Sequence, residues 1–128
     1  MIKTKYIYTP KETSDGTRIL IARKWPRGIR KAHFHEWYKE LSQEEDTLKK
    51  WLDSKKTEED WKKYLSKFLP QMKGSEAVGK IEELRERSKK GEIITLLCHC
   101  RPGEHCHRYI IKSKIKGSET FCSIKVAN

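Results

Sequence analysis

The sequence predicts one α/β domain over residues 1–128, a three-layer structure in which a mainly parallel sheet is flanked by helices. Two apolar runs of strand length, residues 18–22 and 92–100, are separated by stretches whose apolar residues recur with helical period. A strand followed by helices and then by another strand is typical of a parallel sheet with a helical crossover. The 128 residues are enough for one hydrophobic core.

Two strands are predicted at the start of the chain. Residues 5–8 alternate weakly between apolar and polar side chains and then give way to a turn signal that ends at Gly16. Residues 18–22 form a continuous apolar run bounded by Gly16 and Pro26. Such a run is typical of a strand that is buried on both faces.

Three helices are predicted in the middle of the chain. The first is preceded by Ser42 and Glu45, which have the spacing of a capping box; the second ends at Pro70. The third begins at Gly74 or at the serine that follows it, and closes at Gly91. Their expected inward-facing residues are Leu48, Trp51 and Leu52, then Trp61, Tyr64, Leu65, Phe68 and Leu69, and then Ala77, Val78, Ile81 and Leu84.

The last third of the chain predicts a strand, a loop, a helix and an edge strand. Residues 92–100 are rich in β-branched side chains and follow a helix directly, as a buried strand would. A loop rich in cysteine and histidine comes next, and then a helix that turns Tyr109 and Ile110 inward. Residues 121–126 alternate as in an edge strand.

Composition narrows the class of protein. No apolar run approaches the ~20 residues that a membrane span requires, and the first residues lack a signal peptide, so we expect a cytoplasmic protein with no membrane partner. In that compartment the four cysteines are expected to be thiols, metal ligands or reactive groups. Abundant Lys and Glu with a single Asn resemble heat-adapted proteins, in which disulfides also occur in the cytosol.

A basic loop, residues 23–30, follows the second strand, and a second loop, residues 98–108, follows the third. If these strands are parallel neighbours, both loops lie at the same edge of the sheet, where α/β proteins bind ligands. Guanidinium groups match phosphate oxygens, so we expect a phosphate-bearing ligand, a nucleotide or nucleic acid, with Trp25 stacking on a base. In the alternative, the arginines pair with glutamates and Trp25 packs under the sheet. The arginines concerned are Arg23, Arg27, Arg30, Arg101 and Arg108.

The second loop also carries a candidate catalytic pair, Cys98 and His107. A cysteine at the end of a strand and before a helix N-terminus, close to Arg and His, lies where a thiolate is stabilised. His107 is the candidate general acid or base. In cysteine phosphatases an arginine stands six positions after the cysteine, whereas Glu104 stands six after Cys98. A phosphatase loop is therefore not expected, and simple packing of the cysteines remains the alternative.

The same cysteines could bind a metal. Cys98, Cys100 and Cys106, with either His105 or His107, offer the ligand types of a tetrahedral zinc site. Their spacing matches no standard zinc knuckle or finger, because C-x-C replaces C-x-x-C and no distant second pair exists. The sequence therefore assigns no metal site and names no cofactor.

The stretch "SDGTRILIARKWPRGIRK" from Ser14 to Lys31, together with "LLCHC" and "EHCHRYII", resembles the signatures of the DUF488 family, including its YeaO-like members. The resemblance covers essentially the whole chain and implies an α/β domain, but no established activity. Where relatives commonly carry acidic residues, this chain has Ala22 and Cys100. An acid–base mechanism that depends on those carboxylates is therefore not expected.

The leading hypothesis from sequence is thus a protein that binds a phosphate-bearing ligand at an arginine-rich pocket. The alternatives are a small enzyme that acts on a phosphorylated or carboxylated metabolite through a Cys/His site, and a thiol or metal sensor. The pI of about 9.6 favours nucleic acid as a partner, since phosphate neutralisation supplies affinity. The sequence leaves open whether the protein is an enzyme, and its oligomeric state.

Overall fold

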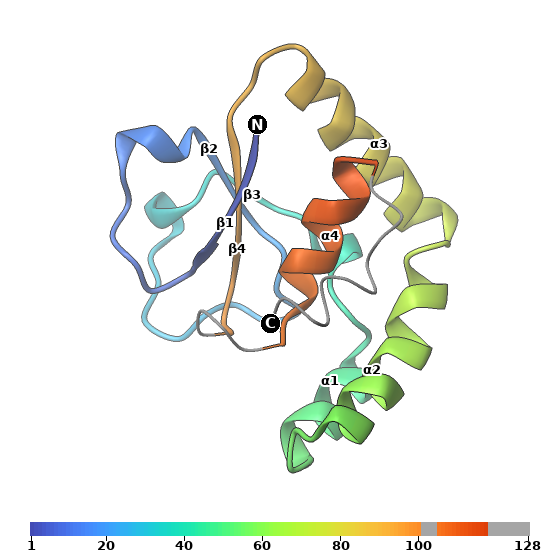
Figure 1. The fold of residues 1–128 in the computed structure, drawn as a ribbon. Helices are drawn as coiled ribbons and strands as arrows, with labels where there is room; N and C mark the ends of the chain where they lie inside the picture. Colours follow the sequence, from blue (N-terminus) through green and yellow to red (C-terminus); the bar gives the residue numbers. More distant parts are fainter. Residues whose placement is uncertain (101–104, 118–128) are drawn as a thin grey trace.

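The computed structural model describes residues 1–100 and 105–117 (Figure 1). Within this part of the chain, a four-stranded sheet has the order β1-β4-β2-β3, with every neighbouring pair parallel. The predicted α/β fold with a parallel sheet is confirmed. The strands are β1 (Ile2–Tyr6), β2 (Thr17–Leu20), β3 (Glu36–Trp37) and β4 (Ile94–Cys98).

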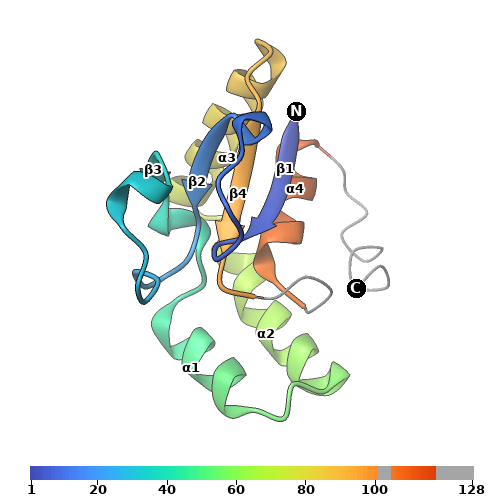
Figure 2. The ribbon, with the colours of Figure 1, turned by 90° about the vertical axis from the view of Figure 1, so that its left-hand side faces the viewer.

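Two helices cover one face of the sheet, and two lie beyond its end. Figures 1 and 2 show α3 and α4 on one face, with α1 and α2 beyond the carboxyl ends of the strands. The opposite face carries loops and the short 3-10 helices Thr13–Asp15 and Lys31–His33. No helix in the described ranges is long and apolar enough to span a membrane. The helices are α1 (Glu45–Asp53), α2 (Glu58–Gln71), α3 (Ser75–Lys89) and α4 (His107–Ile115).

The strands differ from the predicted ranges in length and position. β1 begins at Ile2 rather than at the predicted Lys5. Ile2 is the one buried residue of this strand and the other four are partly exposed, so the sequence shows only a weak alternation there. β4 is buried along its whole length, between β1 and β2. Its burial explains the continuous apolar run in the sequence. The edge strand predicted at residues 121–126 lies outside the described residues.

Three details of the predicted helices are wrong. The Ser42 hydroxyl donates to the carbonyl of Lys39 (2.6 Å), and α1 instead begins after Glu44 without a side-chain cap. α2 runs one residue past Pro70, because a proline in the last turn removes only one backbone hydrogen bond. Leu52 and Val78 are 57% and 40% exposed rather than inward-facing.

The sheet separates two apolar clusters. Ile19 and Leu96 belong to the cluster under α3 and α4, whereas their chain neighbours Leu20 and Leu97 belong to a smaller cluster on the opposite face. This division follows from the alternation of side chains along a strand. The sheet is therefore buried on both faces although α-helices cover only one.

Gly79 offers a test of the α3 assignment. It lies exposed within α3, and a Cβ atom added there would meet nothing within 4 Å. We expect Gly79→Ala to raise the free energy of unfolding by about 0.5–1 kcal/mol, because alanine loses less backbone entropy in a helix. Urea titration would show a higher midpoint with an unchanged slope. A lower midpoint would contradict a regular helix at this position.

Candidate functional site

A pocket of about 260 Å³ lies beyond the carboxyl ends of β2 and β4 and is also lined by α1 and α2. Its lining includes the cysteines at and after the end of β4, the backbone segment after β2, and side chains from α1 and α2. No Asp or Glu is among the described residues that line it. The pocket therefore occupies the edge of the sheet at which the sequence predicts a ligand.

Three thiols lie at one side of this pocket. The Sγ atoms of Cys98, Cys100 and Cys106 all lie within 4.8 Å of one another. Cys98 is the last residue of β4, and Cys106 is the N-cap residue of α4. Cys98 and Cys106 are buried, and Cys100 is half-buried. The strand end and the helix start thus place these thiols together, although no standard motif spacing indicates it.

The three thiols have different proton affinities. Hydrogen bonds from Cys100 and Cys106 lower the pKa of Cys98 well below its ordinary value, against the effect of burial. A hydrogen bond with Cys106 lowers the pKa of Cys100, but Cys98 and burial outweigh it and raise that pKa to about 11. Burial raises the pKa of Cys106. The cluster therefore favours a negative charge on Cys98 over one on either neighbour.

His107 lies against the thiols at the start of α4. Its Nδ1 is 3.8 Å from both Cys98 Sγ and Cys106 Sγ, and its Nε2 is 2.7 Å from the carbonyl oxygen of Ile21. Burial lowers the pKa of His107, so the ring is neutral and Nε2–H donates to Ile21. Cys98 and His107 are therefore neighbours, and their catalytic role stays a prediction.

Arg108 is fully buried beside the cluster. Its Nη1 donates to the carbonyl of Cys100 (2.5 Å) and lies 3.8 Å from Cys106 Sγ, and its Nη2 donates to the Tyr109 hydroxyl (3.0 Å). Its Nε has no hydrogen-bond partner among the described residues. The guanidinium therefore holds the backbone after β4 and places a positive charge near the sulfurs.

The other predicted arginines are dispersed. Arg23 lines the pocket while its Nε donates to the carbonyl of Gln43 (2.8 Å). Arg27 and Arg30 are exposed and are not among the residues that line the pocket, and Arg101 lies outside the described residues. The expected group of five guanidinium groups is therefore represented in the described pocket lining by Arg23. The binding role of each of these arginines stays a prediction.

Trp25 packs on the face of the sheet that lies away from α3 and α4. Its ring lies 5.1 Å from that of Phe34 and 5.5 Å from that of Trp37, and its Nε1 donates to the carbonyl of Ile29 (2.8 Å). These contacts correspond to the packing alternative, and the side chain is still 43% exposed. Stacking of Trp25 on a base stays a prediction.

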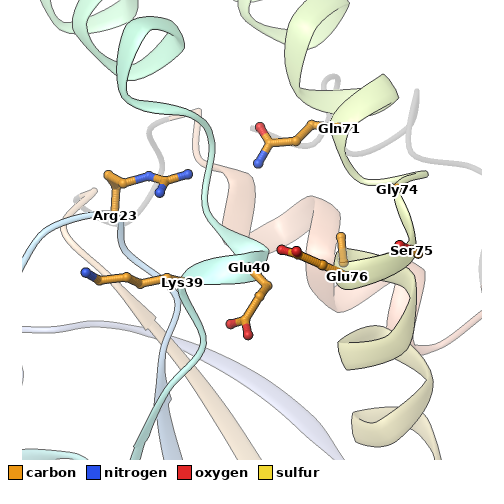
Figure 3. A pocket seen from close by; sticks show the side chains of 8 residues that line it. Arg23, Lys39, Glu40, Gln71, Gly74, Ser75 and Glu76 are labelled. Atoms are coloured by element: carbon orange, nitrogen blue, oxygen red, sulfur yellow. The ribbon is translucent and has the colours of Figure 1, made fainter.

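Arg23 also lines a second, more open pocket of about 390 Å³ at the start of α3 (Figure 3). Lys39 and Gln71 contribute polar groups there, but so do the carboxylates of Glu40 and Glu76. Mixed charge makes this hollow a poor receptor for an anion. The first pocket is therefore the better candidate site.

Aromatic rings line one wall of the pocket at the ends of β2 and β4, and no sequence signal indicated this role for them. Trp61 stacks on His105 (centroids 4.6 Å apart, interplanar angle 9°) and on Tyr64 (4.7 Å, 10°), with Trp51 tilted beside them. These rings were expected only to be core, because helical spacing does not distinguish a core face from a pocket wall. Lys56, which lines the pocket from the connection between α1 and α2, carried no sequence signal either.

Comparison with known proteins agrees with the resemblance in the two loops. A family model named DUF488-N3a and described as "Active DUF488-N3 subclade" matches residues 2–119. "Uncharacterized protein YeaO" of Escherichia coli (strain K12) is 51% identical over 43 residues, which are 32% of this chain and 37% of YeaO. No solved structure matches the chain. Because the family model spans nearly the whole chain, the protein belongs to the DUF488-N3a family.

Proposed function

We propose that the protein binds a small phosphate-bearing ligand, of the nucleotide class, in the pocket at the ends of β2 and β4. The observation that carries the proposal is the composition of the pocket wall. Stacked aromatic rings form one part of it, Arg23, Lys24 and Lys56 bring positive charge, and no carboxylate occurs among its described lining residues. A planar ring that carries an anionic group complements such a wall.

Arg23 and Lys24 are able to face a ligand, and Lys56 is an exposed residue of the pocket lining. Arg23 uses Nε for Gln43, so the outer nitrogens of its guanidinium remain for phosphate oxygens. Lys24 lies 3.6 Å from Glu45, but both side chains are largely exposed, so this ion pair is weak and easily exchanged. The field at the pocket mouth is therefore positive.

The aromatic wall supports the base of a nucleotide. Trp61 stacks on Tyr64 and on His105, and Trp61 and Tyr64 are almost fully buried, so the partly exposed His105 is the ring of this stack that a base would pack against. The rings behind it hold His105 in place, so little side-chain entropy would be lost on binding.

The size of the pocket favours one nucleotide over a strand of nucleic acid. A volume of about 260 Å³ is at the lower end of the range for small-molecule sites. A longer chain would need contacts outside the pocket, and Arg27 and Arg30 are the exposed cations in the loop after β2 that could supply them. Mononucleotides are therefore the first ligands to test.

The test is calorimetric titration of the protein with nucleoside monophosphates, inorganic phosphate and a short single-stranded oligonucleotide. We expect a nucleoside monophosphate to bind more tightly than phosphate alone, because the rings contact the base. Arg23→Ala and Lys56→Ala should each weaken binding, the former by about 10-fold or more because a charge-assisted hydrogen bond is lost. Lys62→Ala, on an exposed part of α2 outside the pocket lining, is the matched control.

Two results would contradict the proposal. One is binding that falls equally in the Lys62→Ala control, since that would indicate attraction to net charge alone. The other is binding of the oligonucleotide only, with a steep salt dependence that Arg27→Ala flattens, which would move the site out of the pocket and onto the exposed loop.

A further inference from the structure

We infer that Cys98, Cys100 and Cys106 bind one zinc ion through their three sulfur atoms, with the fourth coordination position open to the pocket. This inference goes beyond ligand binding in the pocket and does not depend on it. The three Sγ atoms all lie within 4.8 Å of one another, close enough for one ion to contact all three.

The distances suit a tetrahedral ion. Zinc–sulfur bonds of about 2.3 Å place the sulfurs of a tetrahedral site about 3.8 Å apart, so the cluster needs to contract by about 1 Å at most. The backbone at both ends is already fixed, Cys98 by β4 and Cys106 by the start of α4. Small rotations of three thiol side chains are therefore enough to close the site.

The surroundings favour thiolates that share a cation. Without one, mutual repulsion limits the negative charge that three adjacent sulfurs can carry. A divalent ion removes that limit. Two features stabilise the negative charge that remains: the guanidinium of Arg108, whose Nη1 is 3.8 Å from Cys106 Sγ, and the N-terminus of α4. Sulfur ligands favour zinc over magnesium or calcium.

The pocket provides the fourth position. All three cysteines line it, so an ion held between them is reached from the pocket side. Zinc sites with three protein ligands and one open position take a water molecule or a substrate atom there. His107 donates Nε2–H to the carbonyl of Ile21, as metal-ligating histidines do, and its Nδ1 lone pair lies 3.8 Å from two of the sulfurs, so this ring borders the fourth position.

The experiment uses the full chain, purified under reducing conditions and stripped of metal with a chelator, with no nucleotide present. Zinc added back should bind at one ion per chain by elemental analysis. Cobalt(II) in its place should give the intense visible bands of a tetrahedral site and a sulfur-to-cobalt charge-transfer band in the near ultraviolet. Cys100→Ser, at the half-buried position, should weaken metal binding at least about 100-fold and reduce the charge-transfer band.

His99→Ala is the matched control, because His99 is an exposed neighbour of both cysteines in sequence but does not belong to the cluster. It should keep both bands. Absence of tetrahedral bands in the wild type, or bands that persist at full intensity in Cys100→Ser, overturns the inference. Because no nucleotide is present, either result leaves the nucleotide-binding proposal to be decided by the Arg23 and Lys56 variants.

Discussion

Asp15→Asn is expected to lower the free energy of unfolding by about 3–5 kcal/mol, because it removes one partner of a buried ion pair. Asp15 is 2% exposed and Arg18, with which it pairs directly, is fully buried on the face of the sheet away from α3 and α4. Lys5 lies 2.9 Å from the same carboxylate. The neutral amide would leave the Arg18 charge in the interior without its counter-ion.

The measurement is urea denaturation of both proteins near neutral pH. Asp46→Asn is the matched control, since Asp46 forms an ion pair with Lys50 (3.2 Å) in which both side chains are mostly exposed. That control should cost at most about 0.5 kcal/mol. A loss for Asp15→Asn as small as that of the control would contradict the structural role given to the buried pair.

The effect of Asp15→Asn should also depend on pH. Burial by itself would raise the pKa of Asp15, but hydrogen bonds from Lys5, the Glu12 backbone and Arg18 lower it from 3.8 to about 2. A lowered pKa contributes stability above the unfolded value that is lost as the pH falls through the folded value. The difference between wild type and Asp15→Asn should therefore shrink between about pH 4 and pH 2. A difference that stays constant over this window would contradict the assignment.

This ion pair also accounts for one of the positive charges in the stretch from Ser14 to Lys31. Arg18 belongs to the run of positive charges before Lys31, but the structure places it inside, with Nε donating to the carbonyl of His33 (2.8 Å). Sequence alone does not distinguish an arginine that forms a buried ion pair from one that binds a ligand, because both stand beside apolar residues. Its partner Asp15 stands in a turn signal, where acidic residues are ordinary.

The fold was predictable because its main signals are local. Apolar runs, helical spacing and the Gly74 cap identified the major elements, and their order required parallel strands. The errors are at places where tertiary contacts decide. Ser42 has the spacing of a cap but bonds to Lys39, and Val78 has core spacing but lies on the outer side of α3.

The candidate site was predictable in position but not in composition. Parallel order and the rule that ligands bind at strand ends gave the correct edge of the sheet. The aromatic wall comes from α1 and α2, and nothing local in their sequence says that these helices cross that edge. The sequence offered Cys98, Cys100 and Cys106 as possible ligands but matched no standard spacing. Their closeness depends on Cys106, at the start of α4, lying beside Cys98, at the end of β4.

Gly16→Ala is expected to cost about 3 kcal/mol, because a side chain at this position meets backbone rather than a movable side chain. Gly16 has φ of +64°, and a Cβ atom there would lie 2.2 Å from the carbonyl oxygen of Ile93. That oxygen accepts a hydrogen bond from the Thr17 amide (2.8 Å), which sets the register of β2 on β4. Relieving the clash would therefore displace the strand that leads into the pocket.

Gly91→Ala separates the clash from the strain of a positive φ. Gly91 has φ of +98°, but a Cβ atom there meets nothing within 4 Å, so we expect a loss of only about 1 kcal/mol. Denaturant titration of both variants gives the comparison. If the two substitutions cost the same, the close approach of Gly16 to Ile93 relaxes without penalty and does not fix the register. A clearly larger loss at Gly16, accompanied by weaker nucleotide binding, would show that this register also positions the segment after β2 at the pocket.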